Sequence, residues 1–293
     1  MSYVLPYASR SVTRGGCSIP VRGPLRIEDE LIHALDYLYS KGIVINQFHL
    51  TATTTGASET VSIARLTTYY DTTIDWGDGT APETLVANVT TARTHVYATA
   101  GTYPITVNHA HLITQLRIDN AKLGGLDTSE LQYSVLTYFW VTLATNCKID
   151  SADMVDWRPT DWRLYSMPAG TYSISSANMV DWRPTDWYLI SMPTAGSSYT
   201  FAASCMRAWT ALATLTMNDL GLDATTIDAV LADLYAGRMG YTAAAPTATM
   251  GGTNADPTGV YQAMVPPTTG METKYELIND SAAQGFKKWA ITT

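Results

Sequence analysis

A near-identical tandem repeat constrains this chain more than any other feature. Residues 151–168 (SADMVDWRPTDWRLYSMP) return 25 positions later as residues 176–193 (SANMVDWRPTDWYLISMP), with 15 of 18 positions identical. A unit of this length cannot bury its apolar face alone, so neighbouring units must stack and share a core. We expect one strand per unit, at residues 162–165 and 187–190, followed by a turn at Met-Pro.

Degenerate units flank the repeat. Residues 112–120 and 212–218 carry spaced leucines that lead to an Asn. Together with the period, they resemble irregular leucine-rich repeats, in which such an Asn bonds the backbone after the strand. The resemblance implies a leucine-rich-repeat-like solenoid over residues 111–236 and a carboxy-terminal capping unit over 237–293. In the last part we expect a helix capped by Asp223 and a closing strand over residues 286–292.

The chain ahead of the repeats alternates apolar and polar residues with period 2, which predicts short strands. Residues 73–80 (TIDWGDGT), 94–97 (THVY) and 100–103 (AGTY) resemble the signature of the PKD-type β-sandwich. The resemblance implies a PKD-like or Ig-like spacer or adhesion module over residues 47–110, with no catalysis. Its front is short, which predicts an edge strand that is missing or supplied by another chain. The fold class expected is thus mixed β and α/β.

The first 46 residues are expected to anchor or assemble the protein. Proline, glycine and four arginines without an opposing acid dominate up to residue 27, so we expect an extended arm that is either frayed or strapped to a neighbouring subunit. Acidic residues then open a predicted helix at 28–41. No secretory signal pattern is visible. The candidate assembly residues are Arg10, Arg14, Arg22 and Arg26.

Composition excludes several classes of protein. The 18 basic and 26 acidic residues give a net charge of −8, whereas duplex nucleic acid needs clustered Lys and Arg. No apolar run approaches the roughly 18 residues of a membrane span, so no membrane insertion is expected. The three cysteines, Cys17, Cys147 and Cys205, lack metal-site spacing and are interpreted as separate buried thiols.

Each repeat contains two aspartates, which keeps a glycoside hydrolase open as a hypothesis. The pairs are Asp156 with Asp161 and Asp181 with Asp186. Both pairs recur once per unit beside Arg158 or Arg183, which favours repeated Asp–Arg bridges or capped turns instead.

Other candidate sites are weaker. Asp75 and Asp78 supply too few oxygens for calcium and favour a hydrogen-bonded turn. His109 and His111 share a strand face but lack a further ligand nearby. We therefore predict no enzyme, no cofactor and no metal.

Four tryptophans mark the repeats. Trp162 and Trp187 fall at strand positions, which favours the core over sugar stacking. For the two tryptophans that precede Arg-Pro, core and ligand stacking both stay open. The candidate surface contacts are Trp157, Arg158, Trp182 and Arg183.

A PKD-like module that leads into leucine-rich-repeat-like units resembles bacterial surface proteins and virion proteins of tailed bacteriophages. The resemblance implies a structural or adhesion protein of a virion, such as a head fibre, decoration or tail-associated protein. We expect it to form a homo-oligomer, to contact other virion subunits and to meet a host-surface glycan or protein. The alternative is a secreted or cell-surface bacterial adhesin.

Overall fold

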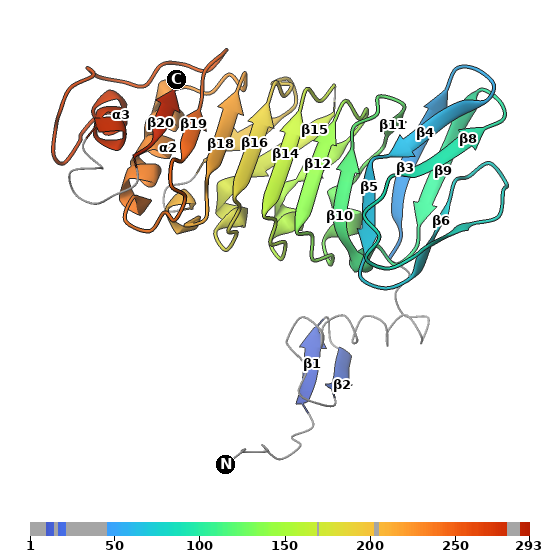
Figure 1. Ribbon diagram of the computed structural model, residues 1–293. Helices are drawn as coiled ribbons and strands as arrows, with labels where there is room; N and C mark the ends of the chain where they lie inside the picture. The colour runs from blue at the N-terminus through green and yellow to red at the C-terminus, as the bar shows by residue number, and fades with distance from the viewer. Residues whose placement is uncertain (1–9, 15–16, 22–45, 169, 202–204, 280–287) are drawn as a thin grey trace. The chain divides into compact units, whose positions relative to one another are not determined.

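The computed structural model describes residues 10–14, 17–21, 46–168, 170–201, 205–279 and 288–293 (Figure 1). The chain divides into two compact units, residues 1–47 and 48–293, and each is described by itself. Among the described residues, no helix has both the length and the apolar character to span a membrane.

The first unit contains a hairpin. β1 (Arg10–Arg14) and β2 (Cys17–Val21) pair antiparallel, with Arg10 opposite Val21. Arg10 and Arg14 thus lie in a paired strand, a local structure that the sequence analysis did not predict, while their role in an assembly arm stays a prediction. The other assembly candidates, Arg22 and Arg26, and the predicted helix 28–41 lie outside the described residues.

The second unit begins with two small sheets, which we call the two-sheet module (residues 48–107). One sheet has the order β11-β3-β9-β6-β7, in which β11 (Leu123–Gly124) comes from the chain beyond the module, and the other pairs β4 with β8. Alternate residues of β3 point inward, so Phe48, Leu50 and Ala52 are buried. Its strands are β3 (Phe48–Thr54), β4 (Glu59–Ile63), β6 (Thr72–Asp75), β7 (Glu83–Leu85), β8 (Arg93–Tyr97) and β9 (Gly101–Val107).

The two-sheet module runs without a break into the rest of the unit. β5 (Arg65–Thr68) pairs antiparallel with β10 (Ile113–Ile118), and β11 (Leu123–Gly124) pairs antiparallel with β3. The edge strand expected to be missing or donated by another chain is thus supplied by this chain itself. The sequence could not show this, because the β11 pairing spans about 70 residues.

A long sheet of eight strands forms the rest of the second unit's front (Figure 1). After β5, its strands run parallel and in chain order, which confirms the strands expected at 162–165 and 187–190. We call each of these parallel strands, with the chain that leads to the next, a coil. The strands are β10, β12 (Tyr138–Thr142), β14 (Asp161–Tyr165), β16 (Asp186–Ile190), β18 (Thr214–Asn218), β19 (Thr247–Thr249) and β20 (Ala290–Thr292).

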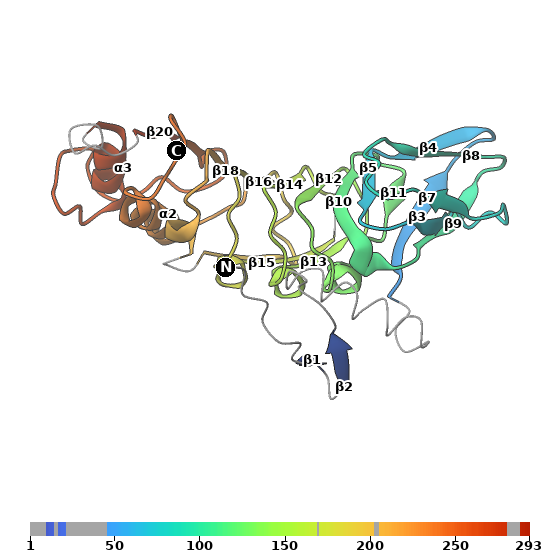
Figure 2. The ribbon, with the colours of Figure 1, turned by 60° about the horizontal axis from the view of Figure 1, so that its bottom comes forward.

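The return side of the coils carries elements that the sequence analysis missed. A second parallel sheet of β13, β15 and β17 lies opposite the long sheet (Figure 2), and a short 3-10 helix η2, η3, η4 or η5 lies on the same side. These elements are β13 (Lys148–Asp150), β15 (Thr171–Ser175), β17 (Ser198–Thr200), η2 (Thr128–Leu131), η3 (Ser151–Met154), η4 (Ser176–Met179) and η5 (Met206–Ala208).

Coil length grows along the stack while the long sheet keeps its register. Phe139, Trp162, Trp187, Leu215 and Ala248 lie side by side on successive strands, although the spacing in sequence rises from 23 to 33 residues. The return side takes up the added residues, including α2 (Ala224–Gly237) and later α3 (Gly270–Asn279). As expected, Asp223 caps α2 by accepting a hydrogen bond from the Thr226 amide at 2.8 Å.

Candidate binding surface

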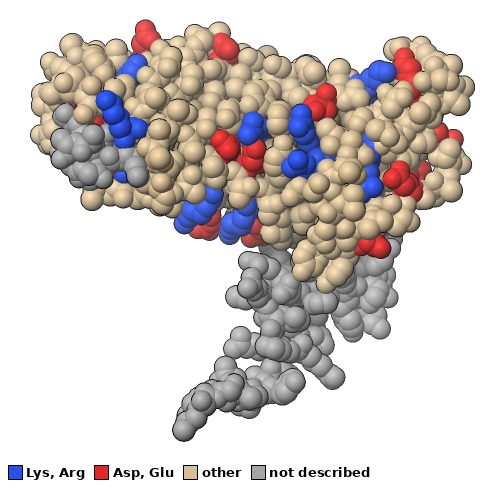
Figure 3. Space-filling view, viewed as in Figure 1, with Lys and Arg blue, Asp and Glu red and all other residues tan. Residues whose placement is uncertain are grey.

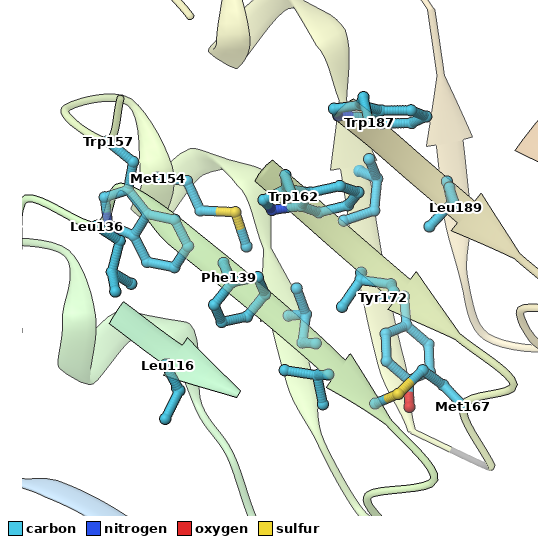
Figure 4. Packing of buried hydrophobic residues seen from close by; sticks show 14 of the residues in the cluster. Leu116, Leu136, Phe139, Met154, Trp157, Trp162, Met167, Tyr172, Trp187 and Leu189 are labelled. Carbon is cyan, nitrogen blue, oxygen red and sulfur yellow. The ribbon is translucent and has the colours of Figure 1, made fainter. Parts of the chain in front are cut away.

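The two tryptophans left open by the sequence lie inside the coils. Trp157 and Trp182 are fully buried (Figure 4 shows Trp157 among its neighbours). Each indole Nε1 donates to a carbonyl of the preceding coil, Trp157 to Leu131 at 3.1 Å and Trp182 to Met154 at 3.3 Å. The prediction of these two residues as ligand contacts is therefore wrong. The sequence of one repeat could not show this, because the carbonyl that each indole binds belongs to the preceding coil.

Trp162 and Trp187 fill the space behind the long sheet, as predicted. Their rings stack with centroids 5.0 Å apart and an angle of 14°, and both are fully buried (Figure 4). Trp162 and Trp187 are register partners on β14 and β16, so their rings pack side by side on adjacent strands. Parallel offset packing of this kind adds to the stabilisation that aromatic burial alone gives.

Arg158 and Arg183 stay at the surface, as expected, but they bind the backbone. Arg158 donates to the carbonyls of Val155 at 2.9 Å and Trp157 at 2.6 Å, and Arg183 binds the equivalent carbonyls of its own unit. Each guanidinium thus satisfies acceptors at the end of a 3-10 helix. The hydrogen bonds of both side chains therefore stabilise the backbone of their own coils.

One aspartate of each pair, Asp161 or Asp181, forms an ion pair. Asp161 binds Arg163 on its own strand through two hydrogen bonds, and Asp181 lies 4.0 Å from Arg158 of the preceding coil. The pair with Arg163 cannot recur in the next unit, where Tyr188 takes that position, so the expectation of the same Asp–Arg bridge in each coil is not met. This arrangement favours a structural role over general acid–base work.

The turn after β6 is a hydrogen-bonded unit, as predicted for Asp75 and Asp78. Asp75 accepts from the Gly77 amide at 2.9 Å, and Asp78 accepts from the Thr80 amide at 3.1 Å and from His95 Nε2 at 2.7 Å. The hydrogen bond from the Thr80 hydroxyl, followed by that from His95, lowers the pKa of Asp78 to about 2.

Within the described ranges, the structure shows neither a metal-binding cluster nor a reactive thiol. No group of three or more His, Cys, Asp or Glu side chains there is placed to hold a metal ion, and this includes His109 and His111. Burial raises the pKa of the Cys147 and Cys205 thiols to about 12, which keeps them protonated and unreactive near neutral pH.

The outer face of the long sheet carries a ladder of cations and rings, which we call the ladder face. The Arg117 guanidinium lies 3.9 Å from the Trp140 ring, and Arg163 lies between Trp140 at 4.8 Å and Tyr188 at 4.5 Å. Register puts these side chains on adjacent strands from β10 to β16. The ladder face consists of Arg65, Arg117, Tyr138, Trp140, Arg163, Tyr165 and Tyr188.

Acids pair with two of the three arginines on the ladder face, and Arg65 donates to the Gln115 side chain. Arg117 pairs with Asp119 at 2.9 Å, and Arg163 pairs with Asp161, so basic and acidic side chains alternate over the middle of the sheet (Figure 3). All members of the ladder are partly exposed, and desolvation raises the pKa of Tyr138 and Tyr165. Ion pairs and ring contacts therefore hold the side chains of the face in place, and each of them stays partly exposed to solvent.

The sequence contained a signal for this face that was not read. The strands YFWVT, DWRLY and DWYLI alternate with period 2, so every second residue of each had to face away from the core. Only the register between strands, however, brings Arg163 between Trp140 and Tyr188.

Comparisons of this chain with protein-family models, curated proteins and solved structures gave no match.

Proposed function

We propose that this chain is a non-enzymatic structural and adhesion protein that presents its ladder face to a macromolecular partner. The ladder face is the observation that carries the proposal. Trp, Tyr and Arg are the residue types that dominate the energy of protein interfaces, and here neighbouring strands hold them in place before any partner arrives. A preorganised surface loses little side-chain entropy on binding.

The chemistry elsewhere supports a scaffold. The carboxylate of Asp161 is occupied by Arg163, and Arg158 and Arg183 cap 3-10 helices of the coils. Sheets shared between the two-sheet module and the coils make residues 48–293 one compact unit. A unit of this kind suits display and contact better than turnover.

We place the protein on the virion of a tailed bacteriophage, as a head fibre, decoration or tail-associated protein. The PKD-like sequence signature and the leucine-rich-repeat-like units support this setting. Residues 1–46 would anchor the chain to other virion subunits, and the coils would point outward. The alternative setting is a secreted or cell-surface adhesin.

Fractionation tests the setting. Antibodies raised against the purified chain would be used on cultures of the strain that encodes it, after phage particles are sedimented. Recovery with intact particles supports the virion, whereas recovery in the medium or on cells without particles supports the adhesin.

Cell binding tests the ladder face. Trp140→Ala and Arg163→Ala should each weaken the binding of labelled protein to host cells about 30-fold, which corresponds to roughly 2 kcal/mol at a central interface residue. Arg158→Ala with Arg183→Ala is the matched control, because these exposed arginines lie off the ladder face. Equal loss in the control, or full binding by folded ladder variants, would contradict the proposal.

A further inference from the structure

The largest ring of the ladder face stands between two cations. The Trp140 indole lies 3.9 Å from the Arg117 guanidinium and 4.8 Å from that of Arg163, its register partners on β10 and β14. Because these strands flank β12 on either side, the two guanidinium groups cover opposite faces of the indole. Tyr188 in turn lies against Arg163 at 4.5 Å and stacks on Tyr165 with ring centroids 5.7 Å apart. The ring face of Trp140 is therefore engaged within the protein, and a partner meets its edge.

Covered ring faces disfavour a glycan as the partner. Sugars bind aromatic side chains by packing C–H groups on the electron-rich ring face, which is the same face that a cation occupies. At Trp140 a sugar would have to displace a guanidinium that an acid holds in place. Arg163 is held by Asp161 through two hydrogen bonds, and Arg117 pairs with Asp119 at 2.9 Å. Neutral hydroxyl groups gain little by replacing such charge-assisted bonds.

Charges of both signs on the outer face of the long sheet disfavour a polyanion. Asp161 and Asp186 are register partners on β14 and β16, so two carboxylates lie side by side next to the arginines. An acidic polysaccharide or an anionic lipid surface would bring its charges against these aspartates, in a chain whose net charge is −8. A folded protein, by contrast, can place acidic and basic side chains at fixed positions that complement both signs.

Arg65 shows where a protein partner can add a contact. Its guanidinium lies 4.4 Å from the Tyr138 ring and donates to the Gln115 side chain at 3.5 Å, and no acid pairs with it within the described part of the chain. A carboxylate of the partner can therefore pair with Arg65 without breaking an existing ion pair.

We propose that the ladder face binds a folded protein and that glycans and polyanions are not its ligands. This inference rests on the proposed function, in which the ladder face is the contact surface. The partner carries a carboxylate opposite Arg65, a cation opposite Asp161 and Asp186, and apolar groups that meet the ring edges. Buried aromatic and arginine side chains inside a polar rim are the usual composition of a protein interface.

Arg117→Ala separates the two kinds of partner, because it uncovers one face of the Trp140 indole. A protein partner loses a guanidinium at the interface, so the binding of labelled full-length protein to host cells should fall about tenfold. A glycan would instead gain an open ring face, so its binding should hold or rise. Arg158→Ala with Arg183→Ala is the matched control off the ladder face and should bind like the wild type. Unchanged or tighter binding by a folded Arg117→Ala variant would overturn the inference.

Treatment of the host cells identifies the class of the bound molecule. The quantity measured is the ladder-dependent binding, which is the difference in bound protein between the wild type and Arg163→Ala. Shaving the cells with proteinase K should abolish this difference, whereas mild periodate, which oxidises the vicinal diols of sugars, should leave it unchanged. Loss after periodate, or persistence after proteinase K, would overturn the inference.

Untreated cells separate this inference from the proposed function. If Trp140→Ala and Arg163→Ala bind untreated cells like the wild type, the ladder face is not the contact surface and both proposals fail. If these variants lose binding to untreated cells but the difference is sensitive to periodate, the ladder face remains the contact surface and only the protein partner is excluded.

Discussion

The coils and the two-sheet module build their cores in opposite ways. In the coils one contact recurs: Trp157, Trp182 and Trp209 each donate to a carbonyl one coil earlier. In the two-sheet module the contacts occur once, around the turn after β6, where the buried Tyr97 hydroxyl donates to the Trp76 carbonyl at 2.9 Å. The coils thus reuse one kind of hydrogen bond, whereas the Tyr97 contact joins a single pair of residues in the module.

The largest effect should come from removing a ring in the middle of the coils. Trp162→Ala should lower the free energy of unfolding by about 3–5 kcal/mol, because the space between Phe139 and Trp187 cannot collapse. Chemical denaturation would measure the loss. Trp187→Ala should cost about as much if the coils are equivalent, and a clearly smaller loss there would break the comparison.

Trp162→Phe separates the ring from its polar atom. The Trp162 Nε1 is buried and has no hydrogen-bond partner among the described residues, so replacing the indole by a benzene ring removes an unsatisfied donor. We expect Trp162→Phe to cost much less than Trp162→Ala.

A smaller effect is expected in the two-sheet module. Asp78→Ala should lower the free energy of unfolding by about 1–3 kcal/mol, because the Thr80 amide and His95 lose their acceptor. Asp78→Asn is the control, since its amide oxygen can still accept from Thr80 while the charge opposite His95 is lost. Denaturation should therefore rank the wild type above the Asn variant and the Asn variant above the Ala variant.

Acid should weaken the same turn. The pKa of Asp78 is lowered to about 2, from an ordinary value of 3.8, chiefly by the Thr80 hydroxyl. A lowered pKa means that the folded state favours the carboxylate, so this contribution is complete above about pH 4 and is lost as the pH falls towards 2. The difference in stability between the wild type and Asp78→Asn should shrink across this range, and a constant difference would contradict the assignment.

Removal of a whole coil should cause the smallest loss in the free energy of unfolding. Deleting residues 161–185 joins Thr160 to Asp186 and reproduces the local sequence WRPTDW. Strand β16 can then take the place of β14 against β12, because Asp161 and Asp186 hold the same register. The variant should fold cooperatively, and its longest dimension in X-ray scattering should fall by about 5 Å, one strand spacing. An unfolded product would show that the coils are not interchangeable.

The sequence predicted the parts of the fold that repeat or follow local rules. The strands at residues 162–165 and 187–190, the turn around Asp78 and the helix capped by Asp223 are all confirmed. In each case the deciding signal lies within a few residues, as an alternation, a turn composition or an N-cap.

The features that the sequence did not predict depend on distant pairings. The buried Trp157 indole donates a hydrogen bond to a carbonyl 26 residues earlier, and Leu123 pairs with the edge of β3. The ladder face depends in the same way on the register that places Arg163 against Trp140. The sequence of one unit does not reveal any of these partners. The candidate site therefore lies on the outer face of the long sheet, whereas Trp157 and Trp182 are buried inside the coils.

The growth of coil length without loss of register has a practical consequence. Side chains on the long sheet sit at a nearly constant spacing set by backbone pairing, whatever the length of the chain behind them. The turn at Gly196 on the return side is exposed and has open space around it, so foreign peptides could be grafted there without disturbing the opposite surface. One surface of the molecule thus presents side chains at a regular spacing, and the turn at Gly196 offers a separate place for an inserted peptide.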